Sequence, residues 1–177
     1  MKRLVLVNGV PASGKSIVAH AIAQATGWPL LALDTIKEAL FAHLGTGDRL
    51  YNRKLGQASY QAMFDLVRDF PADATVIGDA WFGFQPADVL AAYIARASIG
   101  RTVEVWCHAP PEVIGGRYRA RLAGRSPGHL GADYIPELVD LAQRAQPMGT
   151  SPVLNVDTTV RLDVADLTTQ IRAALGT

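Results

Sequence analysis

Short apolar runs alternate with longer amphipathic segments along the chain. Five runs have the β-branched and apolar content of buried strands and are bounded by turn-forming residues: 4–7, 30–33, 75–78, 103–107 and 153–156. Seven segments have the apolar spacing of helices: 15–26, 35–44, 49–69, 86–99, 111–122, 134–145 and 163–175. The alternation predicts an α/β fold of three layers, with a five-stranded parallel sheet between two layers of helices.

The predicted topology indicates where a site would lie. Ligands of parallel α/β sheets bind at the carboxyl ends of the strands, so the residues directly after each apolar run are the candidates. Asp163 is expected to cap the last helix. No repeat or low-complexity linker divides the sequence, which predicts one domain over residues 1–177.

The first strand is followed by a glycine-rich loop. Residues 9–16 read GVPASGKS and match G-x-x-x-x-G-K-[ST] between a predicted strand and a predicted helix. Gly9 and Gly14 let backbone N–H groups turn inward, and the helix start adds free donors, so the loop suits phosphate. Lys15 is expected to reach the β- and γ-phosphates and Ser16 to ligate Mg²⁺. The expected nucleotide-binding residues of this loop are Gly9, Pro11, Ala12, Ser13, Gly14, Lys15 and Ser16.

Asp34 follows the second strand. A carboxylate there is a candidate base for a substrate hydroxyl, and Lys37, one helical turn later, could neutralise substrate or phosphate charge. The alternative is that Asp34 only caps a helix starting at Thr35. Both roles are compatible, because a capping carboxylate keeps one oxygen free.

Asp79 follows the third strand and precedes an aromatic loop. A carboxylate at this strand end could hold Mg²⁺ through water or bind a substrate hydroxyl. Trp81 and Phe82, with Phe84 nearby, are candidates for the wall of an acceptor pocket. Core packing is the alternative for these rings.

Arg117, Arg121 and Arg125 recur at every fourth residue, so on a helix they share one face. The turn-forming residues 126–128 follow them, which predicts a mobile lid over about 117–130. Arg117 would bind the nucleotide, and Arg121 and Arg125 would neutralise the transferring phosphoryl group and exclude water. A solvated basic helix face is the alternative.

Charge and cysteine content narrow the classes of partner. The net charge of +1 provides no field that would attract nucleic acid or an anionic membrane. Cys107 is the only cysteine, so no internal disulfide can form and a cytoplasmic location is expected. No apolar segment is long enough for a membrane helix.

Asn155–Thr158 lacks the lysine of an N-K-x-D guanine motif, so the sequence favours adenine as the nucleotide base. The four histidines form no recognisable metal motif.

Together, the glycine-rich loop and the segments LDTIKEAL, VIGDAWFGF, VEVWCHAPPEVIGGRYRAR and NVDTT resemble the small P-loop kinases that include chloramphenicol phosphotransferase, zeta toxins and polynucleotide 5′-kinases. The resemblance covers most of the chain, except residues 45–70 and 130–150, where an acceptor would bind. It implies ATP and Mg²⁺ as cofactors, Asp34 as the base and lid arginines among Arg117, Arg121 and Arg125.

These observations predict an ATP-dependent phosphotransferase acting on a hydroxyl of a small molecule, such as an antibiotic or a sugar-like compound. A polynucleotide or nucleoside 5′-hydroxyl kinase is one alternative, which the near-neutral charge disfavours. A toxin-like kinase of a nucleotide sugar is another. A nucleotide-binding regulator without turnover, in which Asp34 is only a cap, is the alternative that is not an enzyme.

Overall fold

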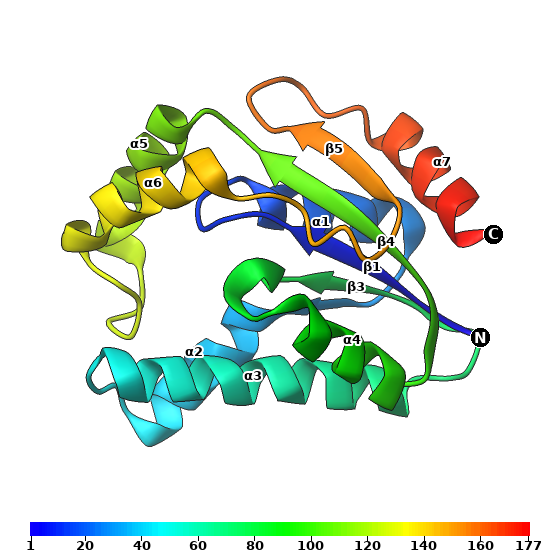
Figure 1. Cartoon of the computed structure of the whole chain (residues 1–177), viewed down its shortest axis with the longest axis horizontal. Coiled ribbons are helices and arrows are strands. Elements are labelled where there is room, and N and C mark those ends of the chain that lie inside the picture. The colour runs from blue at the N-terminus through cyan, green and yellow to red at the C-terminus, as the bar shows by residue number, and fades with distance from the viewer.

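The computed structural model describes residues 1–177 and contains one parallel five-stranded sheet (Figure 1). Its strands are β1 (Lys2–Asn8), β2 (Leu30–Ala32), β3 (Thr75–Asp79), β4 (Ile99–His108) and β5 (Val153–Asp157). Their order across the sheet is β2-β3-β1-β4-β5, and every neighbouring pair is parallel. All carboxyl ends therefore meet at one edge of the sheet, with Asp79 level with Val7 on one side and Ala32 on the other.

Seven α-helices surround this sheet. They are α1 (Lys15–Thr26), α2 (Leu33–Leu44), α3 (Arg49–Asp69), α4 (Ala87–Arg96), α5 (Pro111–Arg121), α6 (Ile135–Arg144) and α7 (Val164–Leu175). Short 3₁₀ turns occur at Phe82–Phe84, Leu122–Gly124 and Ala132–Tyr134.

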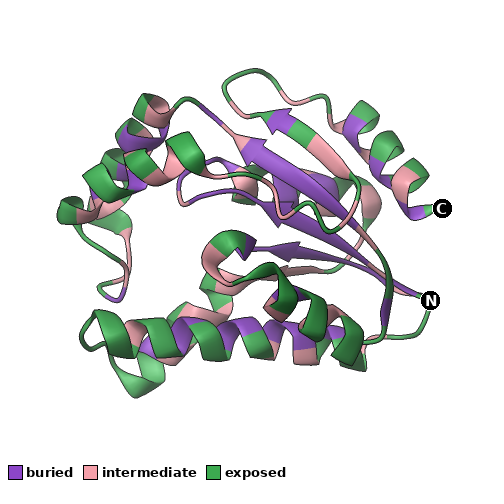
Figure 2. Ribbon diagram, viewed as in Figure 1, coloured by how far each residue is buried: buried purple, intermediate pink, exposed green.

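The two faces of the sheet are buried by different helices. Along β1, Val5 and Val7 pack with α1 and α7, whereas Leu4 and Leu6 pack with α3 and α4. This split follows from the two-residue period of a strand, and it explains why β1 is apolar at every position from 4 to 7. Figure 2 shows the result as a continuous buried centre covered by helices with exposed outer faces.

A third apolar cluster lies at the carboxyl edge of the sheet. Ile114 and Tyr118 of α5 and Leu138 of α6 pack there with Val10 and Ala12 of the glycine-rich loop. The α5–α6 pair is thus joined to this loop by buried contacts, and α2 and α3 lie together on the other side of the molecule (Figure 1).

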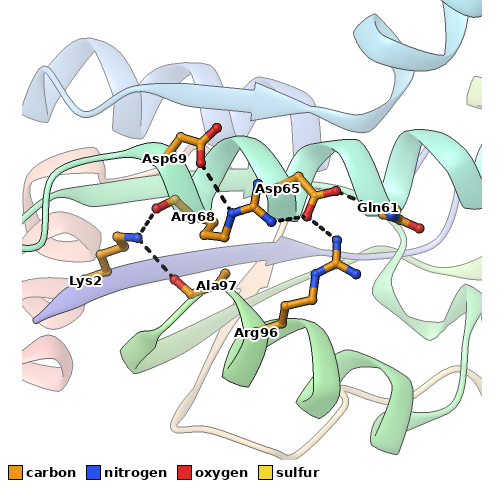
Figure 3. A network of polar contacts seen from close by, with 7 residues as sticks. All are labelled: Lys2, Gln61, Asp65, Arg68, Asp69, Arg96 and Ala97. Atoms are coloured by element: carbon orange, nitrogen blue, oxygen red, sulfur yellow. Dashed lines mark hydrogen bonds and ion pairs between the residues drawn. The ribbon is translucent and has the colours of Figure 1, made fainter.

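Polar contacts at the opposite edge of the sheet tie β1, α3 and α4 together (Figure 3). Lys2 Nζ donates to the main-chain oxygens of Arg68 and Ala97, the latter at 3.3 Å. Asp65 accepts from Arg68 and Arg96. The partners lower the pKa of Asp65, first through its hydrogen bond with Arg96. This network fixes the edge of the sheet at which the strands begin, and it is remote from the edge at which they end.

The fold class predicted from the sequence is confirmed, and each of the five strands and seven helices overlaps its expected range. The predicted fourth helix was too long, because α4 ends at Arg96 and β4 already begins at Ile99. Asp163 accepts from the N–H of Asp166, so the predicted cap of the last helix is confirmed as well. The prediction for the second helix was two residues late, because α2 begins at Leu33 directly after β2. None of the helices combines the length and the apolar character needed to cross a membrane.

Candidate active site

The glycine-rich loop between β1 and α1 has the backbone of an anion cradle. Gly9 (φ +155°), Ala12 (φ +64°) and Gly14 (φ +92°) adopt positive φ values, and the N–H of Ser13 donates to Val10 O at 3.1 Å. A Cβ at Gly9 would collide with Cys107 O and Ser13 Oγ. The left-handed conformation at Ala12 is unfavourable for a residue with a side chain, so the surrounding structure must impose it.

The helix start behind this loop is left free for a negative ligand. Gly14 is the N-cap of α1, no side chain caps the first N–H groups, and the first turn contains no acidic residue. The helices α3 and α7, in contrast, have Asp48 and Asp163 as side-chain caps. Free N–H groups and the partial positive charge of a helix terminus favour an anion such as phosphate.

Arg121 from the end of α5 faces the same loop. It lines a crevice, the phosphate-loop crevice, whose walls are Ala12, Gly14, Lys15, Ser16, Ile17 and Arg121. Neither Lys15 nor Arg121 forms an ion pair with a carboxylate. The crevice therefore gathers two cations without an ion-pair partner beside a helix start.

Asp79 lies at the end of β3 beside this crevice and is buried, with 5% of its surface exposed. One oxygen, Oδ1, has no hydrogen-bond partner. Burial raises the pKa of Asp79, while the positive charge of Lys15 and the Ser16 hydroxyl act in the opposite direction. A buried carboxylate with a free oxygen next to a serine hydroxyl has the oxygen donors that Mg²⁺ prefers. Nowhere do three His, Cys, Asp or Glu side chains gather into a metal site, so a cation here would depend on ligand oxygens as well.

Asp34 lies in the first turn of α2 and is exposed. Its carboxylate makes no hydrogen bond and no ion pair, and the N-cap position is occupied by Ala32 without a side-chain cap. The interpretation of Asp34 as a helix cap is therefore wrong, because the helix already includes residues 33 and 34. Asp34 follows directly after β2, whose last residue Ala32 pairs with Asp79, so the two carboxylates lie at the ends of neighbouring strands. The charge of Asp34 accordingly contributes to raising the pKa of Asp79.

Lys37 is partly buried one turn further along α2. Burial lowers the pKa of Lys37; Asp34 raises it again, and Arg125 lowers it further. Its ammonium lies 5.3 Å from the centre of the Phe41 ring and has no carboxylate within ion-pair distance. Asp34, Lys37 and Arg125 thus form one electrostatic group at the carboxyl edge of the sheet.

Arg125 reaches this group from the segment after α5. Its guanidinium stacks over the Tyr118 ring at 4.6 Å, and the Tyr118 hydroxyl donates to Leu130 O at 2.7 Å. Further along, His129 Nε2 lies 2.8 Å from Glu38 Oε1, and Gly128 packs against Phe41 so closely that a Cβ would not fit. The loop at 125–131 therefore extends from α5 to the face of α2, as the ribbon in Figure 1 shows.

A second polar link joins the same two parts of the molecule. Arg49 at the start of α3 pairs with Glu137 of α6 at 2.7 Å, and both side chains are more than half exposed. Together with the Glu38–His129 contact, this pair is one of two polar bridges between α2–α3 and α5–α6.

Arg117 is held differently from Arg121 and Arg125. Its Nη1 and Nη2 donate to Thr158 Oγ1 and Thr158 O at 2.9 and 2.8 Å, and Thr158 Oγ1 donates to Ser13 O at 2.6 Å. The guanidinium is therefore engaged with the loop after β5, and through Thr158 it supports the glycine-rich loop.

The two aromatic candidates differ in position. Trp81 is partly exposed, packs with the cluster of Val10 and Ala12, and lies 6.0 Å from the Trp106 ring. Phe82 is fully buried against Tyr60 in the core between β3 and α3. Phe82 therefore cannot form part of a pocket wall, and the core-packing alternative describes it.

Several residues of the site have no signal in the sequence. Asn8, Tyr118, Thr158 and Glu38 contact partners that lie 12 to 96 residues away along the chain. Only the position of Asn8 and Thr158 directly at strand ends could have singled them out.

Comparison with known proteins relates this arrangement to a family and to several kinases. A family model described as "AAA domain" matches residues 4–145. No curated protein sequence gives a match. A protein from Chloroflexus aurantiacus j-10-fl to which kinase activity is attributed is 26% identical, with 98% of each chain covered and a TM-score of 0.83.

Two more distant structures are similar in fold. A sugar kinase from Janibacter sp. HTCC2649 is 19% identical, with 99% of this chain and 95% of that chain covered and a TM-score of 0.59. A shikimate kinase from Bacteroides thetaiotaomicron is 21% identical, with 99% and 98% covered and a TM-score of 0.56.

Proposed function

The chain belongs to the AAA domain family, and we propose that it is an ATP-dependent phosphotransferase that moves the γ-phosphate to a hydroxyl of a small molecule. The observation that carries the proposal is the phosphate-loop crevice, in which Lys15, Ser16 and Arg121 lie beside an uncapped helix start. The kinases of similar fold support the reaction class, because the sugar kinase and the shikimate kinase are both named for small acceptors.

The triphosphate would be bound by Lys15 and by the backbone N–H groups of the glycine-rich loop. Ser16 and Asp79 would hold Mg²⁺, since the hydroxyl and the free Asp79 oxygen are neighbouring oxygen donors. When bound, Mg²⁺ would neutralise charge on the phosphate oxygens. Arg117 would support the nucleotide side indirectly, through Thr158.

The proposed transfer uses Asp34 and the remaining cations. Asp34 would accept the proton of the acceptor hydroxyl while the hydroxyl oxygen bonds to the γ-phosphorus. At the same time, the bond from that phosphorus to the β–γ bridging oxygen breaks and ADP leaves. Lys15, Arg121 and Arg125 would stabilise the charge of the phosphoryl group. A lid over 117–130 that carries Arg121 and Arg125 would exclude water, which limits hydrolysis of ATP.

The acceptor would lie next to Asp34, with Lys37 and Trp81 as the candidate contacts. Lys37 has no carboxylate partner and is therefore free to bind a polar or negative group of the acceptor. A phenicol, an aminoglycoside or a sugar-like alcohol is the proposed class, in line with the resemblance to chloramphenicol phosphotransferases.

The test is ADP release with ATP and Mg²⁺ in the presence of phenicols, aminoglycosides, sugars, nucleosides and 5′-hydroxyl oligonucleotides. Acceptor-dependent ADP release with a small alcohol is the expected result. Phosphate on oligonucleotide ends would identify a polynucleotide kinase instead. Tight ATP binding without turnover on any acceptor would identify a nucleotide-binding regulator and contradict the proposal.

A further inference from the structure

Glu104 is a fully buried carboxylate in the middle of β4 with no basic partner. Three N–H donors satisfy it instead. Oε1 accepts from Asn8 Nδ2 at 2.7 Å and from the N–H of Met148 at 3.0 Å, and Oε2 accepts from the N–H of Gly149 at 3.3 Å. A buried carboxyl group is costly unless its oxygens are hydrogen-bonded, so we expect Glu104 to have a role that an apolar residue could not perform.

Asn8 connects Glu104 to two segments of the candidate site. Its Oδ1 accepts from the N–H of Gly9 at 2.8 Å and from the N–H of Phe82 at 2.9 Å, and Asn8 itself is fully buried. Gly9 begins the glycine-rich loop, and Phe82 begins the 3₁₀ turn three residues after Asp79. One amide oxygen thus holds both segments.

The orientation of this amide depends on Glu104. Both Glu104 oxygens accept hydrogen bonds from N–H groups, so the NH₂ end of Asn8 must face Oε1. The carbonyl end must then point to the two backbone N–H groups. With an apolar residue at position 104, the NH₂ end would lose its partner and only the two backbone N–H groups would hold the amide, which weakens its fixation.

We propose that Glu104 is a positioning residue for the phosphate loop: it fixes the Asn8 amide, and the amide fixes Gly9 and the turn that follows Asp79. The bonds to Met148 and Gly149 connect the segment after α6 to the same point. The functional part of this inference rests on the proposed nucleotide site, since it concerns the loop that would bind the phosphates.

The experiment compares Glu104→Ala and Glu104→Gln with Val103→Ala. Val103 is the neighbouring residue of β4, is fully buried and packs on the other face of the sheet, so its truncation destabilises the core without touching the Asn8 amide. Glutamine can still accept from Asn8 through its Oε1 and is the conservative rescue. The measurements are the affinity for ATP, the stability to urea, and residue-resolved amide hydrogen exchange of Gly9 and Phe82.

We expect the Gly9 and Phe82 amides to be protected in the native protein and in Val103→Ala, but to exchange faster in Glu104→Ala. The same variant should bind ATP on the order of tenfold more weakly, as expected for the loss of a hydrogen bond to a charged group. Glu104→Gln should fall between Glu104→Ala and the native protein in both measurements. Val103→Ala should lose stability and keep its affinity.

Two results would overturn the proposal. One is a folded Glu104→Ala variant that is less stable but retains native ATP affinity and amide protection, because Glu104 would then be only structural. The other is fast exchange of Gly9 and Phe82 in the native protein, which decides the question even if Glu104→Ala does not fold. Absence of ATP binding in the native protein would contradict the proposed function, while amide exchange would still test the positioning by Glu104.

Discussion

Arg117 donates from two guanidinium nitrogens to Thr158, to its hydroxyl at 2.9 Å and to its main-chain oxygen at 2.8 Å. The same hydroxyl donates to Ser13 O at 2.6 Å, so α5, the end of β5 and the glycine-rich loop meet at one threonine. Gly14 packs against this threonine as well: a Cβ on Gly14 would lie 3.0 Å from Thr158 Cβ. The Arg117–Thr158 contact joins residues that are 41 positions apart in the sequence.

Arg117→Ala should lower the free energy of unfolding by about 1.5–3 kcal/mol, because two hydrogen bonds from a charged donor are lost. Urea unfolding measures this, with Arg119→Ala as the control, since Arg119 is exposed and makes no hydrogen bond. Combining Arg117→Ala with Thr158→Val should cost less than the two single changes together, because they remove the same contact. Equal stability of the Arg117 and Arg119 variants would contradict the structural role.

Asp34→Asn should reduce turnover by roughly 10² to 10⁴ fold and leave ATP affinity near the native value, because the amide cannot accept the hydroxyl proton. The measurements are steady-state ADP release and ATP binding. Asp88→Asn is the matched control, since Asp88 is also an acidic residue in the first turn of a helix. Undiminished turnover in Asp34→Asn would remove Asp34 from the mechanism.

Gly9→Ala should prevent the native loop conformation, because its Cβ would meet Cys107 O and Ser13 Oγ and because φ is +155°. We expect loss of ATP binding and a clear drop in the thermal midpoint. Gly116→Ala provides the contrast. A Cβ at this helical position of α5 meets nothing within 4 Å, so the change should stabilise the protein by about 0.5–1 kcal/mol. Normal ATP binding by Gly9→Ala would show that the loop does not need this backbone.

Asp79→Asn should raise stability at neutral pH while lowering turnover. Burial raises the pKa of Asp79, so the folded protein binds its proton more tightly than the unfolded chain does. The contribution of this group to stability is therefore complete below the unfolded pKa, near 3.8, and is lost as pH rises through the higher folded pKa. The stability advantage of the asparagine variant should therefore increase as the pH rises above 3.8 and level off once the pH exceeds the folded pKa of Asp79.

Urea unfolding of both proteins across this pH range measures the effect. A constant difference between the two proteins would mean that Asp79 titrates alike in the folded and unfolded chains. A gain in stability with a loss of Mg²⁺-dependent turnover would be typical of a buried carboxylate retained for binding.

The sequence predicted the sheet and the glycine-rich loop because both depend on local signals. Apolar runs bounded by turn residues identify strands wherever they pack, and the loop needs glycine at particular positions. Phe82 shows the limit of this reasoning. An aromatic residue after a strand can face a pocket or the core. The direction of the Phe82 side chain is set here by the hydrogen bond of the Phe82 backbone N–H to Asn8, 74 residues away.

Contacts between distant segments could not be predicted either, because local sequence signals do not show which distant residues become neighbours. Arg117, Arg121 and Arg125 share a spacing, but α5 ends at Arg121, and each arginine meets a different neighbour: Thr158, the phosphate-loop crevice and Tyr118. Their separate surroundings come from how α5 packs on the sheet edge. The roles proposed for Asp34 and Asp79 remain predictions that the variants above test, and the role proposed for Lys37 also remains a prediction.

The Arg49–Glu137 bridge between α3 and α6 involves two exposed side chains, whereas the histidine of the Glu38–His129 bridge is largely buried and the contacts of Asn8, Glu104 and Thr158 are buried or partly buried. An exposed pair such as Arg49–Glu137 contributes little to folding, so mutations at it are tolerated more easily than mutations at the buried contacts. Under the proposed function, evolution can therefore alter exposed residues on the acceptor side while leaving the phosphate-loop crevice unchanged. Divergence among related proteins should accumulate first at the exposed positions of α2, α3 and residues 125–131, where a new substrate preference can arise without disturbing buried residues of these helices such as Phe41 and Tyr60.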